Sequence, residues 1–428
     1  METWLPRCGQ STSRFNTTRR ALGFRKIMFL HRSFRSSGKG RDMRRPSTTR
    51  HFGFSLLEMT IAMALGMIVL AASVQLYSKA VGATWLVTQR AEMQQDFRSA
   101  TNILTKDISM AGSGLGNNVQ IALPSGAGTQ IPIYGCDQTP RCYINGGGVA
   151  YPTQLVSGVN VPYLYGLMPG WRFGPTIRAS AGATDVITVA SADTIFLLNC
   201  YNIATRSTTI VRFTLNPQPV TCIIPPPLVA PQAINDPVVG LTPGDLVLFN
   251  LTIGAGAGAT TSTVLAEVTD VRLVAAGIYD VTFAAGDPLR MNQPAAAAGS
   301  LGTIPVGSTG SANRVNVISY YLDNTITPPR LMRQTSGHTP IPVAENVSFL
   351  QFDYDLYNFN TASYLTEQPD GGASQGLTPN QITKVNIKHM AFASTLHGAP
   401  GYQGLDLQTS VSARDLTFKN DYPLSNGP

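Results

Sequence analysis

Charged residues are scarce in this sequence once its first 53 residues are set aside. Asp, Glu, Lys and Arg make up 13% of the 428 residues, and the formal net charge is +7. Residues 1–53 contain 13 Lys or Arg and only two acids, a local charge of +11 that leaves −4 for the remainder. A body without a clustered basic face lacks the contacts that nucleic-acid phosphates require. We therefore expect no nucleic-acid partner.

The motifs of the common enzyme classes are also missing. The sequence has no P-loop, no nucleophile elbow and no Cys/His quartet with zinc spacing. Beyond residue 53 there are only three histidines, His338, His389 and His397. His389 is in phase with Val385 and Ile387, which predicts an inward-facing, hydrogen-bonded histidine rather than a base or a ligand. We expect no enzyme activity, no catalytic residue, no cofactor and no metal.

The best candidates for metal ligands are two acids within the run 346–357, Asp353 and Asp355. They lie two residues apart, so a strand would place both on one face. The surrounding sequence does not form a recognised calcium-binding loop. We interpret the pair as part of a solvated strand face.

Proline is absent from residues 54–123, and this absence permits one long helix. Apolar residues recur through the stretch at helical spacing, and the glycine-rich sequence "AGSGLGNN" at 111–118 supplies a stop. The pattern predicts a helix from Phe54 to about Met110.

The first half of this helix is suited to lipid. Met59–Ser78 are 20 consecutive residues without a formal charge, enough for a helix to cross a hydrocarbon layer of about 30 Å. We place the transmembrane part at about 56–78. Basic residues Arg44, Arg45 and Arg50 precede it, so the positive-inside rule predicts a cytoplasmic N-terminus and an extracytoplasmic body.

One acid, Glu58, lies near the start of this apolar run, where a charge is costly unless it is paired or near the interface. A secretory signal peptide cut near 81–83 fits poorly, because the apolar run is longer than a typical h-region and begins far from Met1. An ordinary membrane anchor would explain every feature except the acid. Glu58 by itself fits two further interpretations. It could extend to the lipid headgroups, or it could complete the capping box Ser55-x-x-Glu58 at the start of the helix.

The local combination of residues adds a more specific interpretation. Gly53, Phe54, Ser55, two leucines and Glu58 precede the apolar run and follow a basic leader, and in this the chain resembles the type IV prepilin family. The resemblance implies that a membrane-embedded prepilin peptidase cuts between Gly53 and Phe54 and methylates Phe54 at its new amino group. It also implies that Glu58, the acid at the fifth mature position, takes part in subunit assembly.

The predicted leader of residues 1–53 is long for a type IV prepilin. Met43 is an alternative start, because "MRRPSTTRHFG" would form a compact basic leader. Residues 1–42 would then be either an artefact of a wrongly assigned start or an unusual extension.

Five cysteines occur, of which Cys8 lies in the leader. Four thiols beyond a membrane segment are typical of an oxidising compartment and predict disulfides. Three connectivities are possible, and the simplest joins Cys136 to Cys142 and Cys200 to Cys222, because each bond closes a local loop. Free buried thiols remain the alternative.

Beyond the helix the 40 glycines and 29 prolines favour turns and strands. The Pro/Gly/Tyr-rich region from 143 to about 180 is predicted to be irregular, and the runs 242–254, 261–274 and 278–284 to form a meander. All the predicted strands lie at 184–200, 208–215, 242–254, 261–274, 278–284, 314–323, 346–357, 382–394 and 407–416.

These elements define an α+β, pilin-like fold, with a long N-terminal helix packed on an antiparallel β-sheet-rich domain. The predicted divisions are a basic leader at 1–53, the pilin helix at 54–110 and an extracytoplasmic β-rich globular domain at 111–428.

The order of strands is similar to that of the large PilW-type minor pilins and, more loosely, of type II secretion pseudopilins. The resemblance implies a minor pilin that helps to initiate or prime pilus assembly from the bacterial inner membrane. Its expected partners are prepilin peptidase, other major and minor pilins, the inner-membrane assembly platform and the lipid bilayer.

Two other functions remain open, a minor pseudopilin of a type II secretion system and an adhesin displayed at a pilus tip. In the adhesin the Gly/Ala-rich inserts 254–260 and 295–312 would be presentation loops, whereas otherwise they would be disordered linkers.

Overall fold

The structure is a computed structural model, and it describes only part of the chain. The described residues are 54–115, 120–124, 153–156, 159–177, 182–193, 195–196, 198–216, 222, 230–254, 256–293, 297–394, 403–413 and 416. The predictions on the leader, Gly53, His397 and the pair Cys136 and Cys142 therefore lie outside the described residues. The chain divides into two units, residues 1–72 and 73–428, and each is described by itself.

A single helix, α1 (Leu56–Ser109), runs through the part of the chain that has no proline. Its bounds are close to those predicted from the apolar periodicity. The helix ends in turns in which the Met110 backbone N–H donates to the Asp107 carbonyl (3.1 Å) and Gly112 and Gly114 take φ of 77° and 69°. Positive φ favours glycine, which explains why the glycine-rich sequence stops the helix here.

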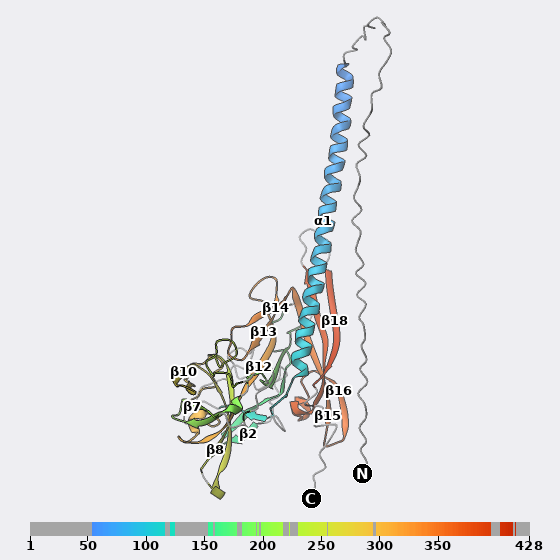
Figure 1. The fold of residues 1–428 in the computed structure, drawn as a ribbon. Helices are drawn as coiled ribbons and strands as arrows, with labels where there is room; N and C mark the ends of the chain where they lie inside the picture. Colours follow the sequence, from blue (N-terminus) through green and yellow to red (C-terminus); the bar gives the residue numbers. More distant parts are fainter. Residues whose placement is uncertain are drawn as a thin grey trace, which may run out of the picture. The chain divides into compact units, whose positions relative to one another are not determined.

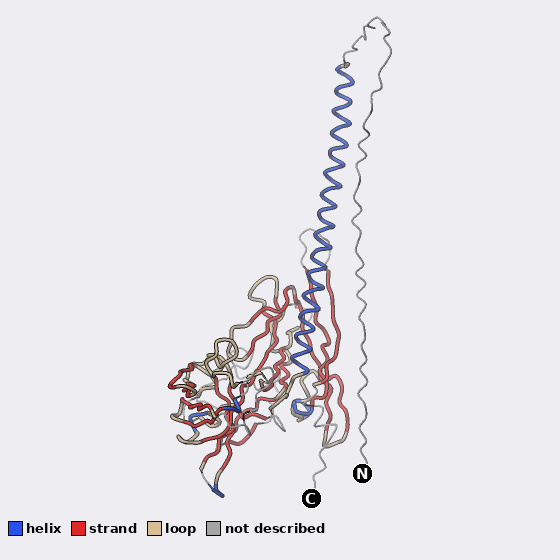
Figure 2. Tube along the Cα trace, in the orientation of Figure 1, coloured by secondary structure: helices blue, strands red, loops and turns tan. Residues whose placement is uncertain are grey.

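Antiparallel strands make up most of the described residues after α1 (Figure 2). The strands are β1 (Gln120–Ala122), β2 (Thr153–Val156), β3 (Val159–Tyr165), β4 (Leu167–Gly170), β5 (Val186–Ala192), β6 (Tyr201–Thr205), β7 (Ile210–Leu215), β8 (Leu246–Ile253), β9 (Thr260–Glu267), β10 (Asp270–Ala275), β11 (Ile278–Thr282), β12 (Thr309–Asp323), β13 (Arg330–Thr335), β14 (Ile341–Glu345), β15 (Val347–Asn358), β16 (Ser363–Gln368), β17 (Ile382–Ser394) and β18 (Gln403–Ser412). Short 3-10 turns lie between some of them, at Leu198–Cys200, Gly256–Gly258, Leu301–Thr303, Ala373–Gln375 and Pro379–Gln381.

The strands form three sheets (Figure 1). The smallest has the order β1-β3-β2, and a four-stranded sheet has the order β16-β15-β17-β18. The largest has 11 strands, with the central order β10-β11-β7-β6-β12-β13-β14 and the pairs β4–β5 and β8–β9 joined to it through β12. The α+β fold class, a long apolar helix followed by an antiparallel sheet-rich domain, is therefore confirmed.

β12 is the hub of the largest sheet. It is 15 residues long and pairs with β5, β6, β8 and β13 along different parts of its length. β8 pairs with its first half, at Thr309–Val315, and β13 with its second half, at Ile318–Asp323. β12 therefore connects the part of the largest sheet that contains β8 to the part that contains β13.

The C-terminal half of α1 packs into a core within the second unit. Its buried residues Ala100, Leu104 and Ile108 belong to one apolar cluster with residues of both the 11-stranded and the four-stranded sheets. Phe97 adds an edge-to-face contact with Phe392 of β17, with ring centroids 5.2 Å apart. The helical spacing of these residues makes one continuous apolar face, and that face is what the sheets cover.

Several strand predictions were wrong in detail. The run 261–274 is two strands, β9 and β10, and the predicted meander does not form because β10 pairs with β11, which in turn pairs with β7. The region from 143 to about 180 was predicted to be irregular, yet β2, β3 and β4 lie in it. β3 pairs with β1 and β4 pairs with β5, so distant partners supply the hydrogen bonds that the Pro/Gly-rich local sequence does not favour.

The Gly/Ala-rich insert 295–312 is not a uniformly exposed loop in its described residues, 297–312, although 305–307 and 309–311 are exposed. Ala297, Ala298, Leu301 and Ile304 are buried, and β12 begins within the insert. Small side chains allow the backbone to pack closely here. The described residues of the other insert, 254–260, include the 3-10 turn Gly256–Gly258 and the first residue of β9.

Candidate functional site

The N-terminal turn of α1 brings Ser55 and Glu58 together. The Ser55 backbone N–H donates to Glu58 Oε2 at 3.2 Å, and the Leu57 N–H donates to Ser55 Oγ, also at 3.2 Å. Each side chain thus accepts a hydrogen bond from an N–H that has no partner inside the helix. The capping box predicted from the sequence is present, and Glu58 is held at the helix start in the isolated chain.

The apolar residues around this cap are exposed. Phe54 is 89% exposed, and the side chains that follow have no covering within the described chain. They include Leu56, Leu57, Met59, Ile61, Met63, Leu65, Met67, Ile68, Val69, Leu70, Val74 and Leu76. By length and composition α1 is the one helix in the described residues that is suited to cross a membrane. Lipid or apolar helices of other subunits would remove this surface from water.

The other half of α1 carries a buried acid that sequence reasoning missed. Asp107 Oδ2 accepts hydrogen bonds from Tyr320 Oη of β12 at 2.5 Å and from Arg333 Nε of β13 at 2.8 Å. Burial, followed by the Asp107 charge, raises the pKa of Tyr320, so the phenol remains a donor. This polar contact ties the last turn of α1 to the largest sheet.

A second acid on α1 lies near the edge strand β14. Asp96 accepts a hydrogen bond from the Glu345 backbone N–H, while burial, and then the charges of Glu345 and Glu92, raise its pKa. Asp96 and Asp107 are 11 residues apart, or about three helical turns, and therefore lie on the same side of α1. The helix is held to β13 and β14 through both.

The sequence contained one signal for Asp107. It follows Leu104 by three residues and precedes Ile108, so it stands on the apolar face of the amphipathic half. An acid on such a face needs a buried partner, by the same reasoning that singled out Glu58. The partners Tyr320 and Arg333 are more than 200 residues away and have no signal of their own.

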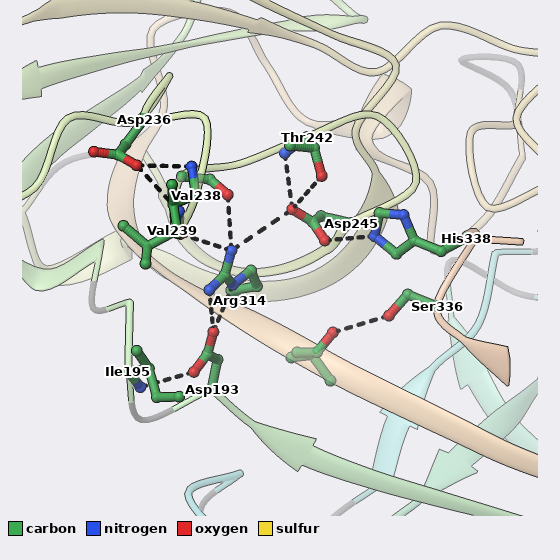
Figure 3. Close-up of polar contacts among 12 residues, drawn as sticks. Asp193, Ile195, Asp236, Val238, Val239, Thr242, Asp245, Arg314, Ser336 and His338 are labelled. Atoms are coloured by element: carbon green, nitrogen blue, oxygen red, sulfur yellow. Dashed lines mark hydrogen bonds and ion pairs between the residues drawn. The ribbon is translucent and has the colours of Figure 1, made fainter. Parts of the chain in front are cut away.

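A polar cluster in the described body is centred on Arg314 of β12 (Figure 3). Its guanidinium is paired with Asp193, which it contacts through Nε at 2.6 Å, and with Asp245 at 3.7 Å. It also donates to the carbonyls of Val239 and Gly240 at 3.0 and 2.9 Å. Arg314 therefore fixes the loop before β8 against β12.

His338 joins the same cluster. Its Nε2 lies 2.8 Å from Asp245 Oδ1, and this hydrogen bond raises the pKa of the imidazole (Figure 3). Asp245 also accepts hydrogen bonds from Thr242 N and Oγ1 at 2.8 and 3.3 Å. Ser336, two residues before His338, makes its hydrogen bonds to the β12 backbone instead of the imidazole. The acid–imidazole pair thus has no nucleophile among the described residues and acts as a connection between loops.

Two sequence interpretations on the four-stranded sheet were wrong. His389 does not face inward: a register irregularity in β17 between Ile387 and Met390 turns it outward, where its side chain is 36% exposed and its Nδ1 lies 2.7 Å from Asp406. Asp353 is not solvated, because Lys388 covers it at 3.0 Å and Asn386 donates to it at 2.8 Å.

The remaining predicted site residues are the cysteines. Cys200 and Cys222 form the predicted disulfide, which closes the ends of the β6–β7 hairpin with a Cα–Cα distance of 4.3 Å. In the described part of the chain, no group of three or more His, Cys, Asp or Glu side chains is arranged to hold a metal ion.

Comparison with known proteins gives one match. The family model described as the prokaryotic N-terminal methylation motif matches residues 48–74, which include Gly53, Phe54 and Glu58. This motif is that of a precursor processed by prepilin peptidase and assembled with other pilin-like subunits. Neither the comparison with curated proteins nor that with solved structures gives a match.

Proposed function

Because the N-terminal segment of this chain is type IV prepilin-like, we propose that the protein is a minor type IV pilin of the PilW type. Prepilin peptidase cuts between Gly53 and Phe54 and methylates the new amino group of Phe54. The mature subunit enters a pilus through α1 and helps to initiate or prime its assembly. Before assembly the subunit is anchored in the inner membrane, with its N-terminus on the cytoplasmic side and its body in the periplasm.

The observation that carries this proposal is the placement of Glu58. It is the fifth residue from Phe54 and the only acid in the exposed apolar half of α1, and it already lies at the helix start. A free α-amino group and a carboxylate are each costly in a low-dielectric layer, and each neutralises the other when adjacent subunits are staggered. In this proposal Glu58 of one subunit pairs with the Phe54 amino group of a neighbour.

The size of the body favours a minor role over a major one. Removal of a 53-residue leader from 428 residues leaves a mature chain of 375, most of it in a domain with an 11-stranded sheet. A subunit that repeats along a whole filament must be compact to pack against its copies. A domain of this size is easier to accommodate at one position, such as the tip.

Mass spectrometry of the mature N-terminus tests the processing step. We expect a peptide that begins with N-methylated Phe54 in membranes from cells with prepilin peptidase, and an uncut chain in cells without it. Peptides of the uncut precursor also decide between Met1 and Met43 as the start. A mature N-terminus near Ala83, or an uncut chain in wild-type cells, would contradict the proposal.

Incorporation into sheared pili tests the role of Glu58. Glu58→Ala is expected to reduce incorporation at least tenfold, because the amino group of a neighbour is left unpaired in lipid. Ser55→Ala is the matched control, since it removes the other half of the capping box and keeps the carboxylate. If both variants lose incorporation equally, helix capping explains the effect and the assembly contact is wrong.

Deletion of the gene separates the two assembly systems. Loss of twitching with secretion intact is expected for a pilus subunit. Loss of secretion with twitching intact would assign the protein to a type II secretion pseudopilus instead.

A further inference from the structure

The hairpin between β15 and β16 ends in a cluster of exposed aromatic rings. Tyr357 lies at its centre, with ring centroids 5.1 Å from Phe359 and 4.9 Å from Tyr364, both in edge contact. Tyr357 and Tyr364 are cross-strand partners, and Phe359 is the first residue of the turn that follows β15. Phe359 is 46% exposed and Tyr364 is 63% exposed. We call residues 357–364 the aromatic tip.

The aromatic tip is held in one conformation by its own polar groups. Asn358 Oδ1 accepts hydrogen bonds from the backbone N–H groups of Asn360 at 2.9 Å and Thr361 at 3.4 Å. The Thr361 and Ser363 hydroxyls lie 2.7 Å apart, and Ala362 takes a φ of 51° to close the turn. Rings held in this way lose little conformational freedom on contact with a ligand.

The aromatic tip has no charged residue, and the nearest charges on its face are paired. Residues 356–366 contain no Asp, Glu, Lys or Arg. On the same face of β15, Asp355 pairs with Lys384 at 3.5 Å. The polar groups beside the rings are amides and hydroxyls, from Asn358, Asn360, Thr361 and Ser363. The tip therefore complements an uncharged ligand that has both an apolar face and hydroxyl groups.

The position of the aromatic tip follows from the register of the sheet. Val347, at the start of β15, pairs with Phe392, the residue that contacts Phe97 of α1. Leu356, near the end of β15, pairs with Ile382 at the opposite end of β17. The tip thus lies at the end of the sheet away from Phe97, beyond the C-terminal end of α1 (Figure 1).

We propose that the aromatic tip is a binding site for an uncharged oligosaccharide. One face of a pyranose ring presents only C–H groups, and it stacks on Phe359 and Tyr364. The hydroxyl groups at the sugar's edge exchange hydrogen bonds with Asn358, Asn360 and Thr361. The inference rests on the proposed function, since it assigns a surface ligand to the body of a minor pilin.

The size of the aromatic tip favours a saccharide over a protein partner. Stable protein interfaces bury about 800 Å² on each partner and involve about 20–30 residues on each side. The tip offers three rings and a four-residue turn, which match one or two sugar rings. Its aromatic and Asn/Ser/Thr side chains provide rigid contact area and adaptable hydrogen bonds in this small space.

The test uses the full chain in lauryldimethylamine oxide, a detergent without a sugar headgroup. The chain is applied to an array of neutral and charged oligosaccharides, and the neutral compounds that bind are titrated by calorimetry. Tyr364→Ala and Phe359→Ala are each expected to weaken binding about three- to tenfold, the effect of losing one ring contact. Tyr364→Trp is expected to retain binding. Leu273→Ala, which removes a side chain on β10 of similar exposure, is the control and is expected to bind as the wild type does.

Two outcomes would overturn the inference. One is that no neutral oligosaccharide binds above the level of the Phe359→Ala/Tyr364→Ala double variant, and the other is equal binding by the wild type and the tip variants. Because binding is measured on the purified chain, it does not depend on assembly, and a failure of the Glu58→Ala test would refute the pilin proposal alone.

Discussion

Glu267 is fully buried at the end of β9, beside the buried carboxyl group of Asp287. Glu267 Oε2 accepts a hydrogen bond from Leu289 N at 2.9 Å, and Asp287 accepts hydrogen bonds from the backbone of Met291 and Asn292 at 2.6 and 3.1 Å. Burial, followed by the hydrogen bond to Asp287, raises the pKa of Glu267 far above its ordinary value of 4.5. Glu267 is therefore protonated in the folded protein at neutral pH and ionised in the unfolded chain.

This difference makes the stability of the folded domain depend on pH. Between the ordinary pKa of Glu267 and its raised pKa, the folded state binds more protons than the unfolded state, so the free energy of unfolding falls as pH rises. Glu267→Gln keeps the shape of the side chain and removes the ionisable carboxyl group. We expect the variant to lose less stability than the wild type between about pH 6 and pH 9, measured by urea unfolding.

Glu367→Gln is the control for that experiment, because this side chain is 70% exposed and pairs only weakly with Lys388. It should follow the wild-type pH curve. Parallel curves for all three proteins would contradict the assignment of a proton to Glu267.

Single residues could be predicted from the sequence where their partners are local. Ser55 and Glu58 are three residues apart, so their capping box is readable from the chain itself. His389 depends on a bulge that forms only when β17 pairs with its neighbours, and the strict alternation assumed for it fails there. Asp353 is buried by Lys388, a residue of another strand.

At the scale of elements, the contact between α1 and the body depends on Asp107. Its removal in Asp107→Ala would leave Tyr320 and Arg333 without their shared acceptor. We expect a loss of about 2–4 kcal/mol in the free energy of unfolding, because two donors in a mostly buried place lose their partner. Urea unfolding of the full chain in detergent measures it.

Lys106→Ala provides the matched control one residue away, since Lys106 is exposed. It is expected to change stability by less than about 0.5 kcal/mol. An equal loss in both variants would contradict a specific role for the Asp107 contact, because Ala has a higher helix propensity than either residue it replaces.

A helix or strand could be predicted where the sequence pattern that identifies it lies within its own residues. The helix has both a long proline-free stretch and apolar periodicity, and β15 alternates buried Leu350, Phe352, Tyr354 and Leu356 with more polar residues, as expected. The strands β13, β14 and β16 were missed, because β13 and β16 are polar and β14 contains Pro342 at the edge of the sheet. These segments form strands because they pair with other strands, and their own sequences do not indicate this.

At the scale of the whole molecule, three apolar clusters share one strand. β12 contributes Ala312 to the cluster around the disulfide, Val315 and Val317 to a second cluster, and Tyr320 with its neighbours to the cluster around α1. A strand that crosses all three cannot leave one of them without disturbing the others. The domain is therefore expected to unfold in one cooperative transition.

Two variants in different clusters test this expectation. Leu104→Ala removes a fully buried side chain of α1, and replacement of Cys200 and Cys222 by Ser removes the disulfide. Each is expected to lower the free energy of unfolding by about 3 kcal/mol. Leu104→Ala leaves a cavity in the core, and loss of the disulfide frees the loop between the two cysteines in the unfolded chain. Calorimetry should show a single transition that both variants shift. Two transitions, each moved by only one variant, would contradict a shared core.

The central place of β12 also has a consequence for the order in which the protein folds. The strand begins at Thr309, after most of the chain has been synthesised, and β5, β6 and β8 all pair with it. Until it emerges, these earlier strands have open edges and cannot complete their sheet. Folding of the body is therefore a late event dominated by contacts between distant residues, which makes it slow. Open strand edges can pair with those of other chains, so the protein is most prone to aggregation during this interval.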